Sequence, residues 1–198
     1  YLDEVDCFIS LPKFKTHDLT ILTGAIKNLF GLVPGTYKTE LHKRYFRASE
    51  FSNMLVEIYK EAPPALSIVD AVVAMEGDGP ATAGKLRNIG LILASRDAVA
   101  LDSVLSIIMG LTPDKIFTTK EAARRNLGVM DLKSIEILGE NLRNIPIKPF
   151  DLPSTSMMYK IPQPVLNIVK NFIKFYPRID KKVCKFCRAC LEACPNGA

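Results

Sequence analysis

The sequence lacks several features that would assign it to a familiar class of protein. No apolar run reaches the roughly 18 residues needed to cross a bilayer, so we expect no membrane span. Neither a Walker loop nor a dinucleotide-binding glycine pattern is present, because Gly24 and Gly31 lie too far apart for either. Nothing upstream resembles a secretory segment, so we expect a cytoplasmic protein. The chain starts at Tyr1 without a methionine, and we expect it to be a fragment at both ends.

The composition is that of an ordinary globular protein, but the charge is unevenly placed. The 198 residues are 48% hydrophobic and 24% charged, and they suit one core of about 150 residues with an appendage. The whole chain has a net charge of +5, yet residues 160–190 alone carry eight basic side chains and one acidic side chain. These basic residues flank cysteines, so we expect no nucleic acid as partner. Two interpretations stay open for them, docking to an acidic redox partner and a solvated basic face.

Four cysteines near the C-terminal end follow the spacing C-x2-C-x2-C-x3-C and are followed by a proline, which is typical of a bacterial-type iron–sulfur site. They are Cys184, Cys187, Cys190 and Cys194. Three thiolates two residues apart can hold one cubane cluster, and the fourth normally reaches a second cluster. We therefore predict a 4Fe-4S cofactor, with two clusters in the intact protein and the partner motif beyond Ala198.

Other uses of these cysteines fit the spacing less well. A zinc ribbon needs two cysteine pairs separated by a dozen or more residues, whereas these four lie within eleven residues. Disulfides within so short a loop would be strained. Because one ligand of the first cluster should come from the missing half, we expect the cluster to be absent or incomplete in this chain. The remaining cysteine, Cys7, lies in an apolar stretch and is interpreted as a buried small side chain.

Apolar runs rich in β-formers alternate with helical stretches from residue 5 to residue 139. This pattern predicts an α/β domain with a largely parallel sheet and flanking helices. The predicted strands are Val5–Leu11, Leu66–Met75, Asn88–Ala94 and Ser134–Leu138. The predicted helices are Leu19–Leu32, Ser49–Glu61, Ala98–Met109 with Asp97 as N-cap and Gly110 as stop, and Thr112–Arg125.

The amino-acid composition of the chain changes after residue 143. Six of the 13 prolines fall between residues 144 and 178, where a short amphipathic helix is predicted at 165–175. We therefore predict three parts: an α/β domain at 1–143, a proline-rich linker at 144–178, and the first half of a ferredoxin-like module at 179–198.

One loop of the α/β domain gathers positive charge. Lys13, Lys15 and His17 follow the first predicted strand, and Lys27 and Asn28 lie on the helix after it. The carboxyl end of a strand beside a helix N-terminus is where open α/β sheets bind anions. The alternative interpretation is that the lysines are solvated and that His17 only caps the helix.

Two further stretches carry carboxylates. Glu76 and Asp78 alternate with Gly77 and Gly79 ahead of Pro80, in a loop that could bind a metal ion, supply a general base or simply turn the chain. Further along the chain, Asp97 is best explained as a helix cap. Asp102 is the more unusual residue, because its neighbours are apolar.

Three segments, SLPKFKTHDLTILTGAIKNLFGLVP, IVDAVVAMEGDGP and ASRDAVALDSVLSIIMGL, together with the trailing cysteine motif, closely resemble the family catalogued as domain of unknown function 362. The resemblance implies an α/β domain that is often joined to a two-cluster ferredoxin-like module, and it implies no reaction. The positions that match the family pattern are Lys13, Lys15, His17, Lys27, Asn28, Asp70, Glu76, Gly77, Gly79, Pro80, Asp97 and Asp102.

These patterns lead to two hypotheses of different class. The first is an iron–sulfur redox protein that relays electrons to chemistry on a small anionic ligand, with Glu76, His17 and Asp78 as catalytic groups. The ligand would be bound by Lys13, Lys15, Lys27, Asn28, Gly77, Gly79, Asp97 and Asp102. The second is a non-catalytic cluster-binding or assembly module whose α/β domain is a docking platform. The first hypothesis requires the lysines and the 76–80 loop to converge on one cleft, and the second expects a filled sheet end.

Overall fold

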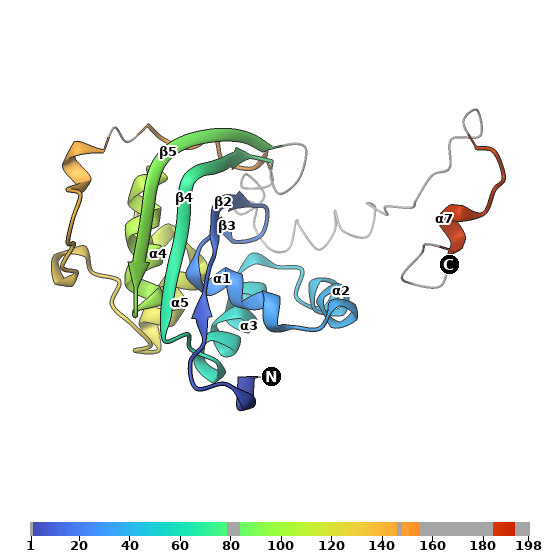
Figure 1. Ribbon diagram of the computed structural model, residues 1–198, viewed down its shortest axis with the longest axis horizontal. Helices are drawn as coiled ribbons and strands as arrows, with labels where there is room; N and C mark the ends of the chain where they lie inside the picture. Colours follow the sequence, from blue (N-terminus) through green and yellow to red (C-terminus); the bar gives the residue numbers. More distant parts are fainter. Residues whose placement is uncertain (1, 79–83, 146–147, 155–183, 193–198) are drawn as a thin grey trace, which may run out of the picture. The chain divides into compact units, whose positions relative to one another are not determined.

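The computed structural model describes residues 2–78, 84–145, 148–154 and 184–192. The chain divides into two compact units, residues 1–159 and residues 160–198. The first unit holds a five-stranded sheet and its helices (Figure 1). The predicted α/β class is therefore confirmed.

Two long strands, β4 (Leu66–Gly77) and β5 (Gly84–Ser95), run side by side as an antiparallel pair, and β5 pairs with no other described strand (Figure 1). Two short strands, β1 (Ile9–Ser10) and β2 (Lys13–His17), pair in parallel with successive parts of β4. The last strand, β3 (Ile21–Thr23), pairs antiparallel with β2. The sheet thus combines two parallel with two antiparallel pairings.

Alternating burial along β4 shows which face of the sheet meets the core. Val69, Ala71 and Ala74 are fully buried, whereas Asp70 and Val72 are exposed on the other face. Side chains alternate between the two faces of a strand, and an irregularity between residues 71 and 73 shifts this alternation by one position. A single apolar core joins β4 to the helices.

The helices of the first unit are α1 (Ala25–Asn28), α2 (Gly35–Arg44), α3 (Ala48–Glu61), α4 (Ala98–Ile108) and α5 (Phe117–Arg124). The predictions of α3 and α4 are confirmed to within a residue at each end. Asp97 caps α4 as predicted, since its carboxylate accepts from the backbone N–H groups of Val99 and Ala100. Gly110 follows α4 with φ of +83°, the left-handed conformation that glycine adopts most readily.

Four predicted elements differ from the structure. The strand predicted at Val5–Leu11 is reduced to Ile9–Ser10, and the helix predicted at Thr112–Arg125 is a 3-10 turn at Pro113–Lys115 followed by α5. The helix predicted at Leu19–Leu32 is instead the strand β3, the short α1 and a 3-10 turn at Leu29–Leu32. The strand predicted at Ser134–Leu138 is absent from the described sheet, and a 3-10 turn at Leu132–Ser134 leads into it. Apolar periodicity alone does not supply a neighbouring strand with which to pair.

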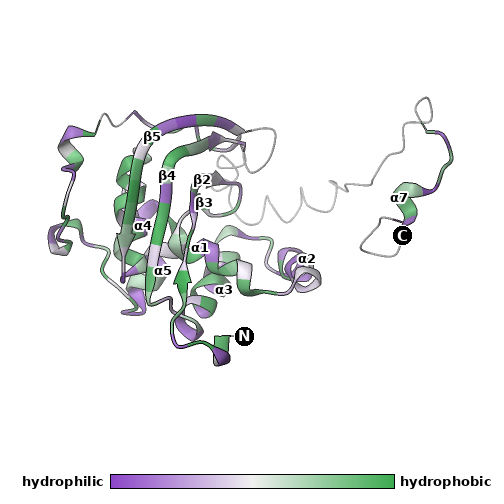
Figure 2. Ribbon diagram, viewed as in Figure 1, coloured by the Kyte–Doolittle hydropathy of each residue, from purple (hydrophilic) through white to green (hydrophobic). Residues whose placement is uncertain are grey.

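The sequence also gave no indication of α2, which has no buried residue. Figure 2 shows this helix largely in the hydrophilic colours, so it has no apolar stripe to detect. In the second unit only residues 184–192 are described, with a short helix, α7 (Ala189–Glu192). The amphipathic helix predicted at 165–175 lies outside the described residues. Among the described helices, none has the length and apolar character to span a bilayer.

Candidate functional site

A pocket of about 260 Å³ opens beside β2 and α1, and its lining is strongly basic. The lining residues are Lys13, Lys15, His17, Thr23, Lys27, Asn28, Phe30, Gly31 and Lys38. The structure thus brings together all five residues that the sequence analysis selected from this region, but it places three of them on a strand. Lys13, Lys15 and His17 are alternate residues of β2, while Phe14 and Thr16 between them are completely buried.

Few of the ammonium groups in this basic pocket have an internal counter-charge. Lys13 Nζ lies 2.7 Å from a carboxylate oxygen of Asp70 on the exposed face of the sheet. Lys38 Nζ lies 3.4 Å from the carbonyl oxygen of Gly31. Within the described ranges, Lys15 and Lys27 form no ion pair with a carboxylate. Their mutual repulsion is therefore left for solvent or an anion to offset.

Lys27 is the most strongly perturbed of these lysines. Burial, reinforced by the charges of Lys15 and Lys38, lowers the pKa of Lys27 from its ordinary value to about 8. Its Nζ lies 5.0 Å from the centroid of the Phe30 ring and 6.0 Å from that of Phe51. The rings attract the ammonium form. Water would stabilise the ammonium form more strongly than these rings do. Lys27 is therefore uncharged more often than an exposed lysine.

His17 enters the basic pocket as a neutral hydrogen-bond donor. Its Nδ1 accepts the backbone N–H of Leu19 at 3.1 Å, which places the imidazole proton on Nε2. Burial, followed by the charges of Lys27, His42 and Lys15, lowers the pKa of His17 to about 3. The ring lies parallel to Phe51 at a centroid distance of 6.5 Å. At neutral pH His17 can therefore donate through Nε2 without adding to the positive charge.

A buried hydroxyl adds a second neutral group to the basic pocket. Thr23 is 6% exposed, and within the described residues its Oγ1 has no hydrogen-bond partner. An unpaired buried hydroxyl is costly unless a ligand or water satisfies it. Asn28, by contrast, donates from Nδ2 to the Ser10 hydroxyl at 2.9 Å and positions the pocket wall.

Glu76 does not join these residues, although it is one of the three predicted catalytic groups. Lys15 pairs with Met75 across β2 and β4, so the next residue, Glu76, points to the opposite face. There the Glu76 carboxylate lies 2.9 Å from Arg87 and also accepts the backbone N–H of Asp151. The predicted convergence of Glu76 with the lysines is therefore wrong, because a one-residue step along a strand reverses the direction of the side chain.

The rest of the predicted 76–80 loop also lies outside the basic pocket. Gly77 ends β4 with φ of +79°, and its carbonyl oxygen accepts from the Thr16 hydroxyl at 2.8 Å. The exposed Asp78 carboxylate accepts the backbone N–H of Ser154 at 2.6 Å, and that hydrogen bond holds its pKa below the usual range. Gly79 and Pro80 lie outside the described residues.

Two other predicted ligand-binding carboxylates are used to hold the backbone. Asp97 caps α4 with one oxygen and accepts the backbone N–H of Val129 with the other. Asp102 is completely buried and accepts from Ala25 N at 2.6 Å and Ile26 N at 3.1 Å, thereby capping α1. Burial raises the pKa of Asp102 to about 7, against the opposing effect of these two donors. The prediction that both bind a ligand is not supported, since their acceptors are already occupied.

The same contact explains the glycine that precedes α1. A Cβ added at Gly24 would lie 2.1 Å from Asp102 Oδ1, closer than any real side chain approaches. Gly24 and Asp102 together hold the N-terminus of α1 and so fix where Lys27 enters the basic pocket. Asp102 is unusual in the sequence because its neighbours are apolar, but its partner 77 residues away could not be inferred from local pattern.

Four residues of the basic pocket were missed by the sequence analysis: Thr23, Phe30, Gly31 and Lys38. Three of them lie within the first quoted family segment, whose spacing could have indicated them. Lys38 lies on α2, the helix that apolar periodicity does not reveal.

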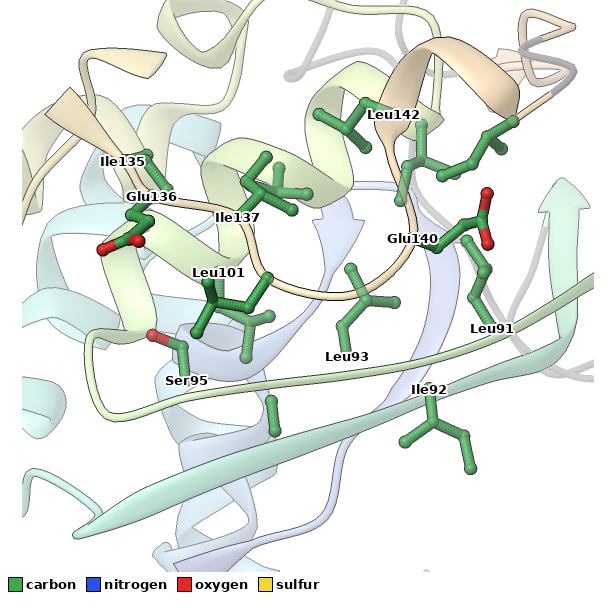
Figure 3. Close-up of a pocket in the computed structure, with 16 residues that line it drawn as sticks. Leu91, Ile92, Leu93, Ser95, Leu101, Ile135, Glu136, Ile137, Glu140 and Leu142 are labelled. Carbon is green, nitrogen blue, oxygen red and sulfur yellow. The ribbon is translucent and has the colours of Figure 1, made fainter. Parts of the chain in front are cut away.

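A second pocket, also of about 260 Å³, lies between β5, α4 and the segment 135–145. Its lining is mainly aliphatic, and Figure 3 shows Leu93 and Leu101 pointing into the space beneath this segment. The carboxylates of Glu136 and Glu140 are the charged groups of its lining. This aliphatic pocket contains none of the residues predicted from the sequence.

The cysteine segment has several features that suit an iron–sulfur cluster. Cys184, Cys187 and Cys190 are free thiols, and Cys187 and Cys190 are exposed. Cys7 is exposed as well, so its interpretation as a buried side chain is wrong. Phe186 and Arg188, on either side of Cys187, have φ of +53° and +59°. Alternation of left-handed and other conformations turns successive N–H groups toward one side, which suits the sulfur atoms of an iron–sulfur cluster. Cys194 lies outside the described residues, and among those described no three metal-binding side chains are gathered at one point.

Fold and cysteine spacing together define an α/β protein that carries a 4Fe-4S binding motif. The chain matches the family model described as Domain of unknown function (DUF362) over residues 1–106, so it belongs to that family. Residues 177–198 match the model of a 4Fe-4S binding domain. The resemblance stated from the sequence is thus confirmed.

One curated relative is a protein named thylakoid-associated protein, from Synechocystis sp.. It is 43% identical to this chain over 127 residues, which are 64% of this chain and 39% of the relative. The chain therefore spans well under half of the length of that relative. No solved structure matches the chain.

Proposed function

We propose that this is an iron–sulfur redox protein whose α/β domain binds a small anionic ligand in the basic pocket, and that the cluster delivers electrons to chemistry on that ligand. The observation that carries the proposal is the pair Lys15 and Lys27, which line one pocket and have no carboxylate partner in the described chain. An anion between them would remove their repulsion and form charge-assisted hydrogen bonds.

Each residue of the basic pocket has a distinct part in this binding. Lys15, Lys27 and Lys38 supply positive charge, and Lys13 is largely neutralised by Asp70. His17 Nε2–H and the Thr23 hydroxyl supply neutral donors that fix the orientation of the ligand. Phe30 forms an apolar wall, which strengthens the electrostatic attraction by excluding water.

The cysteine segment would hold the cofactor through the thiolates of Cys184, Cys187 and Cys190, with Cys194 directed to a second cluster. Such a cluster supplies one-electron transfers over a wide range of potentials. In the full-length protein, purified without oxygen, Cys187→Ser should remove about half of the iron and labile sulfide. Zinc at one equivalent without sulfide would contradict this assignment.

The 76–80 loop does not converge with the lysines as the ligand-binding hypothesis expected, but the basic pocket itself supports ligand binding more than the filled sheet end that the docking-platform alternative expects. Two further expectations stay predictions. One is that an acidic redox partner is attracted to residues 160–190, and the other is a cytoplasmic location. If the basic residues steer a partner, association should slow steeply with ionic strength, since screening shortens to about 8 Å at physiological salt.

Anion binding is tested by calorimetric titration of the protein with inorganic phosphate at pH 7. Lys15→Met should weaken binding about ten- to a hundredfold, the usual worth of a hydrogen bond to a charged group. Lys120→Met is the matched control, because Lys120 is exposed on α5 and does not line the basic pocket. Equal affinity in both variants would contradict the proposed site.

A further inference from the structure

Lys27 occupies a position that simple anion binding does not require. It lies in the last turn of α1, whose first turn is fixed by the buried Asp102. The amine is therefore held by the fold, and its Nζ lies over Phe30 at 5.0 Å and near Phe51 at 6.0 Å. Lysines that only attract an anion work well from exposed and flexible positions.

Its charged neighbours also favour the neutral amine. Lys15 and Lys38 act on Lys27 as like charges, and no described carboxylate pairs with it. A lysine that is desolvated beside other cations is an activated nucleophile, because the lone pair is available at neutral pH. With a pKa of about 8, roughly a tenth of Lys27 amines are uncharged at pH 7, against roughly one in three thousand for an ordinary lysine.

We propose that Lys27 is an imine-forming lysine, whose amine condenses with the aldehyde or ketone group of an anionic ligand held by Lys15 and Lys38. The amine nitrogen bonds to the carbonyl carbon, the carbonyl oxygen leaves as water, and no oxidant or reductant is consumed. The ligand class is then a small carbonyl compound that also carries a carboxylate or phosphate group. This inference rests on the proposed anion site and adds a covalent step to it.

The pocket lining suits this step. The ammonium groups of Lys15 and Lys38 would hold the anionic end of the ligand, and the open pocket of about 260 Å³ accommodates a small molecule. The Nε2–H of His17 and the hydroxyl of Thr23 are neutral donors for the carbonyl oxygen, and neither competes with Lys27 for the proton.

The test uses glyoxylate, which carries an aldehyde beside a carboxylate, with sodium cyanoborohydride to trap the imine. Labelling of the full chain at pH 7 is followed by peptide mass spectrometry. Lys27 should be labelled at least about tenfold faster than Lys120, and inorganic phosphate should suppress labelling at Lys27 alone. Acetaldehyde, which lacks the carboxylate, should show a smaller preference for Lys27.

A matched variant separates this inference from the proposed function. Lys27→Arg keeps the positive charge and cannot form an imine, so it should lose the fast label while Lys120 is labelled at its original rate, and phosphate binding is measured on the original protein. If Lys27 is labelled no faster than Lys120 while phosphate still binds, imine formation is overturned and the anion site stands. If phosphate does not bind the original protein, the proposed function fails as well.

Discussion

The basic pocket and the aliphatic pocket of the α/β domain have about the same volume and opposite chemistry. The basic pocket presents lysines beside neutral donors, whereas the aliphatic pocket is lined mainly by leucine, isoleucine and alanine between β5, α4 and the segment 135–145. Volume therefore does not distinguish a ligand site from a gap between elements. What distinguishes the basic pocket is that, within the described part of the chain, Lys15 and Lys27 have no carboxylate partner and the Thr23 hydroxyl has no hydrogen-bond partner.

The difference also concerns stability. Unpaired lysines repel one another, so the basic pocket lowers the free energy of unfolding in the absence of a ligand. The residues beneath the aliphatic pocket, such as Leu101 and Ile108, are 4% and 2% exposed and contribute to the core. We expect changes in the basic pocket to alter binding, and changes in the aliphatic pocket to alter folding.

The largest effect should come from making the basic pocket resemble the aliphatic one. The double variant Lys15→Met/Lys27→Met removes both unpaired charges, and phosphate affinity at pH 7 should fall about a hundred- to a thousandfold. Thermal unfolding without phosphate should shift upward, because the repulsion is gone. A titration with undiminished affinity, or a variant that unfolds earlier, would remove the distinction between the pockets.

The next largest effect should come from a substitution beneath the aliphatic pocket. Leu101→Ala should lower the free energy of unfolding by about 2–4 kcal/mol, because it deletes buried methyl groups and enlarges an existing cavity. Urea denaturation measures this loss. Phosphate affinity of the folded variant should be unchanged, and a parallel loss of affinity would show that the two pockets are not independent.

A smaller effect is expected from pH. The ammonium form of Lys27 contributes to anion binding below a pKa of about 8, and that contribution is lost as pH rises through this value. Sulfate stays a dianion throughout, so its affinity should fall about tenfold between pH 7 and pH 10. Lys27→Arg remains charged over this range and should show a much flatter profile. An equally steep profile in that variant would assign the titration to another group.

The smallest effect should come from filling the aliphatic pocket. Ala100→Leu adds methyl groups to a position on α4 that lines it, and the free energy of unfolding should rise by about 1 kcal/mol. Phosphate affinity should not change. A clear destabilisation would indicate that the aliphatic pocket has no room at this position, and the comparison of volumes would need revision.

Much of the basic pocket could be predicted from sequence because its residues are close together in the chain. Lys13, Lys15 and His17 alternate along one strand, and Lys27 follows within ten residues of His17, so local spacing was sufficient to group them. Glu76 was misplaced because strand register, which decides the face of each side chain, is a property of the paired strands. Asp102 was misread for a similar reason: its backbone partners lie 76 and 77 residues away.

The fold, too, was predictable where neighbouring residues determine an element and was not predictable where strand pairing does. The helices α3 and α4 were predicted because each has an apolar stripe in consecutive residues, and α4 also has Asp97 as its cap. The segment 134–138 has a strand-like composition, yet in the described structure it crosses the aliphatic pocket without joining the sheet. β-formation depends on a partner strand more than on local preference.

The most direct measurement is the position of a bound anion in crystals of this protein grown with selenate, located by the anomalous scattering of selenium. The account predicts one strong site in the basic pocket, with selenate oxygens within about 3 Å of Lys15 Nζ and Lys27 Nζ and one oxygen facing the Thr23 hydroxyl. Lys15→Met/Lys27→Met crystals should lose that site. Selenate bound only elsewhere, under conditions where the protein binds it in solution, would contradict the central claim.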